Sequence, residues 1–374
     1  MISSKRPYLV IPLLIEQPTW GGDYILTMKK WIQNPSLMAK KIGQSYELFG
    51  RSKLQVNITD TTDPRFAPEM GNAEGRPIED LGLTEDRDYI QLSRIIPHMP
   101  LLIKFTQAAG NSFQMHVKPG TSHERWKPKP ESWYYFEDGL ISCGVKPGAD
   151  IGRYKEVCLE IEAMMKDLSA KVQNSDMSIS DALRTSKEKI KELNPWQFVN
   201  ILETKKDDLI DLSEGGIHHS WEEDRTRAPL GNVVYEVQVD VMDPYCTIRS
   251  FDQGKIKEDG TIREIHVDDY FRYIDTRADH NDIKYLSRTR KDDNLLTTPY
   301  YSLDIIELSG RSPQEISHSF HHLFVKSGSV RVECGDGSVM VTAGHSCIVP
   351  GQAGTYTLTS RAPQSVILKT YIAN

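Results

Sequence analysis

Short segments of β-favouring residues, separated by turn residues, fill residues 1–150 and recur from about residue 301 of this 374-residue chain. Segments such as PLLIKFTQ, SFQMHV and ESWYYFEDG are rich in aliphatic and aromatic residues, and Gly, Pro or Asn lies between them. Toward the C-terminus, Gly separates short runs in which Val alternates with polar residues. Many short strands with such turns predict a mainly β protein of antiparallel barrels or jelly rolls, and the two β regions would fit two barrels of one type.

A helical pattern interrupts the β segments after residue 150. Apolar residues recur there at steps of three and four, which places them on one helical stripe, at Val157, Ile161, Met164, Leu168 and Val172. A second helical segment is expected to begin at Ser180 or Asp181 and to end before Pro195. The sequence therefore predicts a helical insertion over residues 151–207.

This insertion sets the expected domain boundaries. Residues 1–150 and 208–285 are expected to form one β domain, and residues 286–374 a C-terminal barrel. Within the first domain, EDGTIREIHV (258–267) carries an Asp-Gly pair of the kind that favours a hairpin turn.

The early apolar segment YLVIPLLI, residues 8–15, is predicted to be one strand. It is too short to span a bilayer and has no signal-peptide cleavage pattern, so no membrane association is expected.

Composition limits the partners and the compartment. The net charge of −7 and the pI near 5.9 argue against a nucleic-acid partner, because phosphate binding needs a basic face. Cysteines are odd in number and never form a CxxC pair, at positions 143, 158, 246, 334 and 347. We therefore expect a reducing, cytoplasmic compartment. The oligomeric state stays open.

Two polar side chains stand out in SFQMHVKPG, residues 112–120. Gln114 and His116 are two positions apart, so a β-strand would turn both to one face and turn Phe113 and Met115 to the other.

Two further residues could join them as metal ligands. Glu131 follows at a distance suited to the next strand of a hairpin, and His218 lies where the β pattern resumes after the insertion. Nitrogen and oxygen donors without thiolates suit zinc or a similar divalent metal.

Several motifs occur in one order along most of the chain: PTWGG, IGQSYELFG, PLLIKF, SFQMHVKPG, KPESWYY, DLIDLSEGGIHH and YCTIRSFD. In these motifs the chain resembles the type I mannose-6-phosphate isomerase (phosphomannose isomerase) family, which is built on cupin barrels. The resemblance implies two cupin barrels with a helical insertion. It also implies an aldose–ketose isomerase that interconverts mannose 6-phosphate and fructose 6-phosphate. Carried over residue by residue, it implies one zinc ion per chain on Gln114, His116, Glu131 and His218.

The same resemblance implies that Lys129 and Arg249 face the sugar phosphate, and we expect Lys104 at the same mouth. Isomerisation also needs a carboxylate or histidine that can take a proton. The resemblance implies Glu236 for this role, since it matches the strand carboxylate of the family, and Asp243 is the second choice.

The chain departs from the family in the segment VDVMDPYC, residues 239–246. The spacing from Glu236 to Arg249 is three residues longer than in the family. This departure affects the expected sugar substrate more than the expected metal site. The alternatives are therefore a cupin isomerase for another sugar or sugar phosphate, and a non-catalytic metal-containing sugar-binding or regulatory cupin. His318, His321 and His322 in the last barrel are expected to hold no metal.

Overall fold

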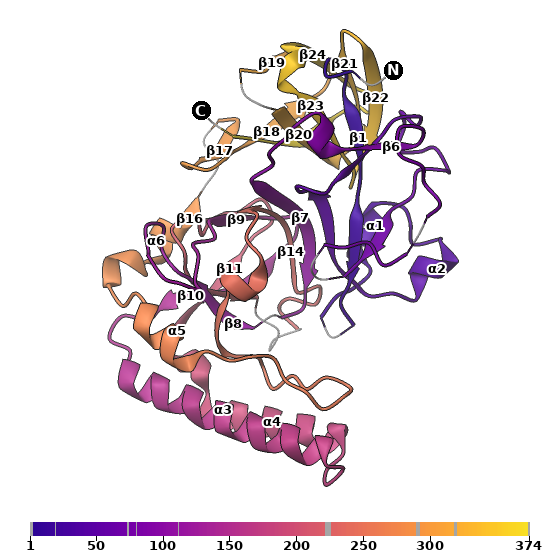
Figure 1. Ribbon diagram of the computed structural model, residues 1–374. Helices are drawn as coiled ribbons and strands as arrows, with labels where there is room; N and C mark the ends of the chain where they lie inside the picture. The colour runs from indigo at the N-terminus through magenta and orange to yellow at the C-terminus, as the bar shows by residue number, and fades with distance from the viewer. Residues whose placement is uncertain are drawn as a thin grey trace.

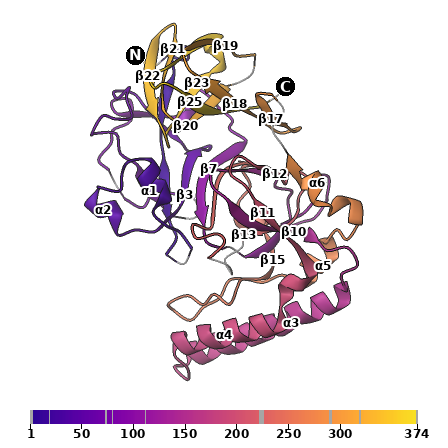
Figure 2. The ribbon, with the colours of Figure 1, turned by 180° about the vertical axis from the view of Figure 1, so that it is seen from behind.

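The structure, a computed structural model, describes residues 3–18, 20–72, 75–79, 81–110, 112–220, 226–288, 292–317 and 320–372. It is mainly β with several sheets, as the sequence predicts. The elements lie in layers, from a helical pair at the bottom of Figure 1 to the C-terminal strands at the top. Figure 2 shows the same order from behind.

Two sheets form the lower half of this stack. The larger, called the middle sheet, has the strand order β16 (Ser287–Arg288), β12 (Leu209–Asp211), β9 (Glu131–Tyr135), β14 (Asn232–Val239), β7 (Leu101–Ala108), β3 (Ile42–Leu48), β2 (Leu13–Glu16) and β5 (Glu69–Gly71). The smaller, called the five-stranded sheet, has the order β11 (Val199–Thr204), β10 (Gly139–Val145), β13 (Gly216–Ser220), β8 (Phe113–His116) and β15 (Ile248–Phe251).

Two further sheets form the upper half. The terminal sheet has the order β17 (Asn294–Thr297), β18 (Ser302–Leu308), β25 (Ser365–Tyr371), β20 (Phe320–Ser327), β23 (Ser346–Pro350), β1 (Tyr8–Ile11), β4 (Lys53–Gln55) and β6 (Tyr89–Gln91). The four-stranded sheet has the order β19 (Arg311–Glu315), β24 (Thr355–Ser360), β21 (Ser329–Cys334) and β22 (Gly337–Thr342).

Alternating side chains of β14 pack the middle sheet against the terminal sheet on one face and against the five-stranded sheet on the other. Tyr235 and Val237 enter an apolar core shared with Phe324 of the terminal sheet, and the rings of Tyr235 and Phe324 lie 5.3 Å apart. Val234 points to the opposite face and packs in a core with Ile141 of the five-stranded sheet. Each such buried apolar side chain contributes about 1.5–3 kcal/mol. Successive side chains of β14 thus alternate between two apolar cores.

The segment YLVIPLLI forms two strands in different sheets, so the prediction of one strand is wrong. In the terminal sheet, β1 pairs with β23, with Tyr8 opposite Ile348. Its continuation β2 pairs with β3 in the middle sheet. Pro12 lies between them, and because proline has no N–H it ends the first ladder. Its carbonyl accepts a hydrogen bond of 2.9 Å from the Glu69 N–H. The chain thus passes from one layer to the next at Pro12.

A buried ion pair connects the N-terminal segment to the terminal sheet. Lys29 Nζ lies 2.7 Å from Glu47 Oε1 of β3, and neither side chain is exposed. The other Glu47 oxygen accepts from Ser346 Oγ of β23 at 2.8 Å, and Lys29 also donates to the Gly344 carbonyl. Loss of either charge would leave the other buried without a partner, at a cost of about 3–5 kcal/mol.

The described helices are α1 (Tyr24–Met28), α2 (Pro35–Met38), α3 (Ile151–Gln173), α4 (Ile179–Leu193), α5 (Val267–Tyr273) and α6 (Ile283–Leu286). The long pair, α3 and α4, covers the outer face of the five-stranded sheet (Figure 1). The predicted stripe on α3 is confirmed. Val157, Ile161 and Leu168 are buried against Phe113 and Met115, and the other two stripe residues pack against the same core.

Helix α4 begins slightly earlier than expected. Ser178, rather than Ser180 or Asp181, is the N-cap, because its Oγ accepts a hydrogen bond of 3.1 Å from the Asp181 N–H. The expected hairpin turn at 258–267 is present as a turn, with a Lys257 N–H to Thr261 carbonyl bond of 2.9 Å, but no strand flanks it.

The expected domain boundaries stay a prediction. β11 lies inside the range 151–207 and pairs with β10, and β1, β4 and β6 of the N-terminal segment lie in the terminal sheet. Across the described ranges, the helices lack the combination of length and apolar character needed to cross a membrane.

Candidate metal centre

The predicted ligands lie between the middle sheet and the five-stranded sheet. In the five-stranded sheet, Gln114 of β8 is opposite His218 of β13 on one side and opposite Arg249 of β15 on the other. In the middle sheet, Glu131 of β9 is opposite Gln238 of β14. The site is thus built from two facing rows of side chains, one on each sheet.

A glycine allows this close pairing of β13 with β8. Gly215 has a φ of +76°, and a Cβ there would lie 2.7 Å from the His116 carbonyl oxygen. Only glycine adopts this conformation without strain at so close an approach. The sequence Gly-Gly-Ile-His therefore brings His218 beside the strand that carries His116.

Glu131 reaches from the middle sheet to both histidines. Its Oε1 lies 2.7 Å from His218 Nε2 and 3.7 Å from His116 Nε2, and one ligand atom from each residue falls within 4.8 Å of the others. Two ligand atoms of a tetrahedral zinc ion, with bonds of about 2.0–2.2 Å, lie about 3.3–3.6 Å apart. The two measured distances bracket that separation.

Both histidine rings direct the lone pair of Nε2 toward the Glu131 carboxylate. His116 Nδ1 lies 2.7 Å from the Cys246 carbonyl oxygen, and His218 Nδ1 lies 3.1 Å from the Gly216 carbonyl oxygen. A carbonyl can only accept, so each Nδ1 carries the proton and each Nε2 is free to bind a metal. Burial, with help from the Lys129 charge, lowers the pKa of His116 to about 4, which keeps the ring neutral.

The amide of Gln114 completes the set. One of its atoms lies 3.1 Å from His218 Nε2, and the other accepts a hydrogen bond of 3.1 Å from Ser112 Oγ. The two ends of an amide exchange places by a half-turn of the last side-chain bond. After that rotation the carbonyl oxygen faces the histidines, and the amide nitrogen donates to Ser112.

The donor set fits a divalent metal on two grounds. His116 Nε2 is fully buried and has no hydrogen-bond partner, a state that native structures rarely leave uncompensated. His218 Nε2 and the Glu131 oxygen are both acceptors at 2.7 Å, and a cation between them removes their repulsion. Gln114, His116, Glu131 and His218 would hold that ion, and two imidazoles with two oxygen donors suit zinc.

Lys129 lies directly beside the Glu131 carboxylate. Its Nζ is 2.9 Å from Glu131 Oε2. Burial alone would lower the pKa of Lys129, but the Glu131 charge raises it above its usual value, so the lysine stays protonated. Burial alone would also raise the pKa of Glu131, which the Lys129 charge instead holds well below its usual range.

A second lysine–carboxylate pair lies on the same face of the middle sheet. Lys104 of β7 is opposite Glu236 of β14, and its Nζ lies 2.7 Å from Glu236 Oε1. Thr106 Oγ1 donates to the other oxygen at 3.3 Å. Because residues i and i+2 share a face, Glu236 lies on the same side of β14 as Gln238, the partner of Glu131.

Arg249 is held at both ends of its guanidinium group. Nε donates to Ser112 Oγ at 3.1 Å, and Nη2 donates to the Asp243 carboxylate. The Arg249 charge holds the pKa of Asp243 well below its usual range, although the Asp243 side chain is 62% exposed. Asp243 is therefore a carboxylate that neutralises Arg249.

Two residues near the site have roles that the sequence did not indicate. Ser112 connects Arg249 to Gln114, and its position two residues before Gln114 is a period-two signal that would have revealed it. His266 accepts a hydrogen bond of 3.2 Å from the Arg249 N–H and donates its own N–H to the Arg249 carbonyl at 2.8 Å. This pair of hydrogen bonds joins residues 17 positions apart, and no local sequence pattern predicts it.

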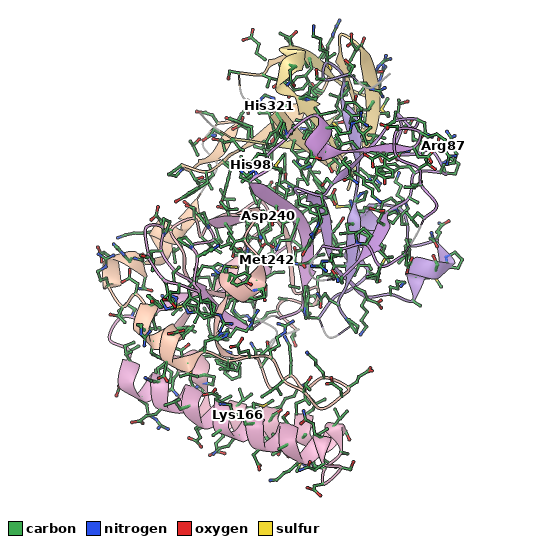
Figure 3. The ribbon with its side chains drawn as sticks, viewed as in Figure 1. Arg87, His98, Lys166, Asp240, Met242 and His321 are labelled. Carbon is green, nitrogen blue, oxygen red and sulfur yellow. The ribbon has the colours of Figure 1, made fainter. Side chains whose placement is uncertain are left out.

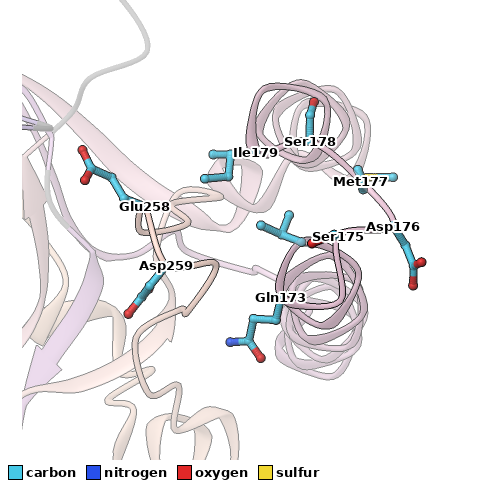
Figure 4. Close-up of a pocket in the computed structure, with 9 residues that line it drawn as sticks. Gln173, Ser175, Asp176, Met177, Ser178, Ile179, Glu258 and Asp259 are labelled. Carbon is cyan, nitrogen blue, oxygen red and sulfur yellow. The ribbon is translucent and has the colours of Figure 1, made fainter.

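A surface groove of about 540 Å³ lies elsewhere, at the turn between α3 and α4 (Figure 4). Met177 and Ile179 from the helical pair, with Glu258 and Asp259 from the facing loop, are among its lining residues. None of the predicted site residues lines it.

The terminal-sheet histidines are hydrogen-bonded to tyrosines. His321 Nδ1 lies 2.9 Å from Tyr356 Oη, and His322 Nδ1 lies 3.0 Å from Tyr235 Oη. His318 lies outside the described residues. Figure 3 shows His321 among the C-terminal strands, well apart from Met242 near the candidate site.

We predict that the double change His321→Ala and His322→Ala leaves the zinc content of the folded protein unchanged, because neither ring belongs to the candidate metal centre. Metal analysis of the purified monodisperse fraction tests this. Loss of zinc from a variant that keeps its β circular-dichroism spectrum would contradict it.

Comparison with known proteins supports the fold by structure rather than by sequence. No known family profile matches the sequence, and no curated protein sequence matches it significantly. A crystal structure of mannose 6-phosphate isomerase from Bacillus subtilis aligns with a TM-score of 0.59 and 15% identity, over 98% of this chain and 100% of that one. A mutant phosphomannose isomerase from Salmonella typhimurium aligns with a TM-score of 0.60 and 12% identity, over 98% and 99%.

A zinc-bound mannose 6-phosphate isomerase aligns with a TM-score of 0.61 and 11% identity, over 98% of this chain and 100% of that one. The resemblance read from the motifs is thus confirmed at the level of three-dimensional structure. Along nearly its whole length, the chain has the fold of the mannose 6-phosphate isomerases.

Proposed function

We propose that the protein is a zinc-dependent aldose–ketose isomerase that interconverts mannose 6-phosphate and fructose 6-phosphate. The observation that carries the proposal is the buried group of His116, Glu131 and His218, which faces the Lys104–Glu236 pair within one intersheet space. A zinc-bound isomerase with the same fold supports the choice of metal.

The reaction moves one proton between C1 and C2 of the open-chain sugar, and one between O1 and O2, through a negatively charged enediolate. A divalent metal, when bound, polarises sugar oxygens and orients the substrate. Glu236 acts as the base that takes the proton from one carbon and returns it to the other. Lys104 holds the Glu236 carboxylate in place at 2.7 Å.

The remaining cations stabilise negative charge. Lys129 places an ammonium group beside the metal ligands, where burial strengthens its effect on a developing oxyanion. Arg249 lies across β8 from the ligand His218 and presents a planar guanidinium to the same space. Its role is to bind the phosphate or the enediolate, since Arg recognises oxyanions bidentately.

The proposed architecture is a pair of cupin barrels. The middle and five-stranded sheets would form the metal-binding barrel, and the terminal and four-stranded sheets the second. Residues 1–150 and 208–285 would supply the first, residues 286–374 the second, and residues 151–207 the helical insertion. A cytoplasmic location is part of the proposal, because all five cysteines are free.

A second candidate is an isomerase of the same chemistry that acts on an unphosphorylated sugar. The ion pair between Asp243 and Arg249 favours it, because this pair neutralises a cation otherwise available for phosphate. A non-catalytic sugar-binding cupin would share the ligands but would have no use for a base beside them.

The deciding experiment is a coupled assay for fructose 6-phosphate formed from mannose 6-phosphate. We expect zinc-loaded protein to be active, a strong chelator to abolish the activity, and added zinc to restore it. Metal analysis of the same samples shows whether removal was complete. Full activity in metal-free protein would refute the metal dependence. Zinc-loaded protein that turns over no aldose, with or without phosphate, would refute the enzyme.

A further inference from the structure

The charges at the candidate site are balanced pair by pair. Lys104 contacts Glu236 at 2.7 Å, and Lys129 contacts Glu131 at 2.9 Å. Arg249 contacts Asp243. Glu236 and Glu131 are the proposed base and a proposed metal ligand, whereas the proposed mechanism gives Asp243 no role. The ion pair with Asp243 nevertheless neutralises the charge of Arg249.

Asp243 belongs to the segment 239–246, which leaves β14 and enters β15. It begins a short 3-10 turn, Asp243–Tyr245, in which Met242 before it and Tyr245 are 60% and 46% exposed. Figure 3 shows Met242 and Asp240 close together beside the middle sheet. Thr247 Oγ1 donates to Asp243 Oδ1 at 2.7 Å and so orients the carboxylate toward Arg249.

Asp243 occupies the edge of Arg249 that an oxyanion would use. A guanidinium binds phosphate with two parallel N–H donors, and the Nε–Nη2 edge is one such pair. In this protein Nε donates to Ser112 and Nη2 donates to Asp243, so that edge is divided between two protein acceptors. A phosphate carries a charge of about −1.5 to −2 and would meet the Asp243 carboxylate at the same place.

We propose that Asp243 is a specificity-determining residue that competes with an anionic substrate group for Arg249. It weakens the preference of the site for sugar phosphates over the matching neutral sugars. This inference rests on the proposed function and adds to it the residue that sets the accepted substrate charge.

The test compares Asp243→Asn with wild type, both loaded with zinc. The ratio of kcat/KM for mannose 6-phosphate to kcat/KM for mannose should rise by about tenfold or more in the variant, because a like-charge repulsion at Arg249 is removed. The matched control is Asp240→Asn, which removes the same charge from a side chain that faces Arg51 and Lys104 instead. The control should leave the ratio within about twofold.

A binding measurement separates this inference from the proposed function. Calorimetric titration of the zinc-loaded proteins with inorganic phosphate should show about tenfold tighter binding to Asp243→Asn than to wild type or to Asp240→Asn. This difference is expected even if no sugar is isomerised; the proposed function then fails, while the competition of Asp243 with an anion for Arg249 stands. Equal phosphate affinity in all three proteins overturns the inference, whatever the activity.

Thr247→Val gives a second variant in case Asp243→Asn does not fold. It removes the hydrogen bond that orients Asp243 but keeps the carboxylate. The shift toward phosphate should have the same direction and be smaller. A shift toward the neutral sugar would contradict competition at Arg249.

Discussion

Replacement of His116 or of His218 with alanine should remove bound zinc and isomerase activity together. Wild type should carry about one zinc ion per chain, and each variant should retain less than about a tenth of that. The two rings are fully buried with their Nε2 atoms at Glu131, so either loss leaves an incomplete donor set around a carboxylate. Elemental analysis after gel filtration, with the coupled assay on the same sample, makes the measurement.

His321→Ala is the matched control, since it removes an imidazole of equal size that is also buried but hydrogen-bonds Tyr356 in the upper layers. It should keep both metal and activity. Stoichiometric zinc in both His116→Ala and His218→Ala would show that the metal, if any, binds elsewhere.

Replacement of Glu236 with glutamine should lower turnover by about a hundredfold or more while zinc stays bound. Glutamine has nearly the same shape and can still contact Lys104 and Thr106, but its amide cannot accept the proton from the sugar carbon. Glu236 is not one of the proposed ligands, so zinc content should match wild type. Steady-state kinetics and metal analysis check the two halves of this expectation.

Solvent-deuterium incorporation into the product gives an independent readout of the same step. It should slow in parallel with turnover in Glu236→Gln and persist in Asp243→Asn. If Asp243→Asn abolishes exchange and Glu236→Gln does not, then Asp243 is the base.

Local patterns in the sequence predicted the parts of the fold that depend on neighbouring residues. Alternation in SFQMHV assigned Gln114 and His116 to one face, and the structure has Phe113 and Met115 in the core on the opposite face. The stripe on α3 likewise follows from helical periodicity and from burial of one side. Such patterns are set within a few residues, so a sequence reveals them.

Features set by distant pairing escaped prediction. In the sequence, YLVIPLLI is one apolar run. Its two halves enter different sheets because they pair with different strands, β23 and β3. The segment between Glu236 and Arg249 contains the 3-10 turn Asp243–Tyr245 after β14. The contact of Asp243 with Arg249 follows from the path of that turn, which no periodicity encodes.

The pairing of β1 with β23 has a consequence for synthesis on the ribosome. Strand β1 lies near one end of the described chain and its neighbour β23 near the other, so β1 has no neighbour on that side until β23 is made. Until then, the core around Phe105 and Tyr235 also lacks the residues that the late strands supply, among them Phe324, Ile348 and Leu368. A nascent chain therefore exposes part of this apolar face until the C-terminal strands are made. Completion of the C-terminal strands then fills this core.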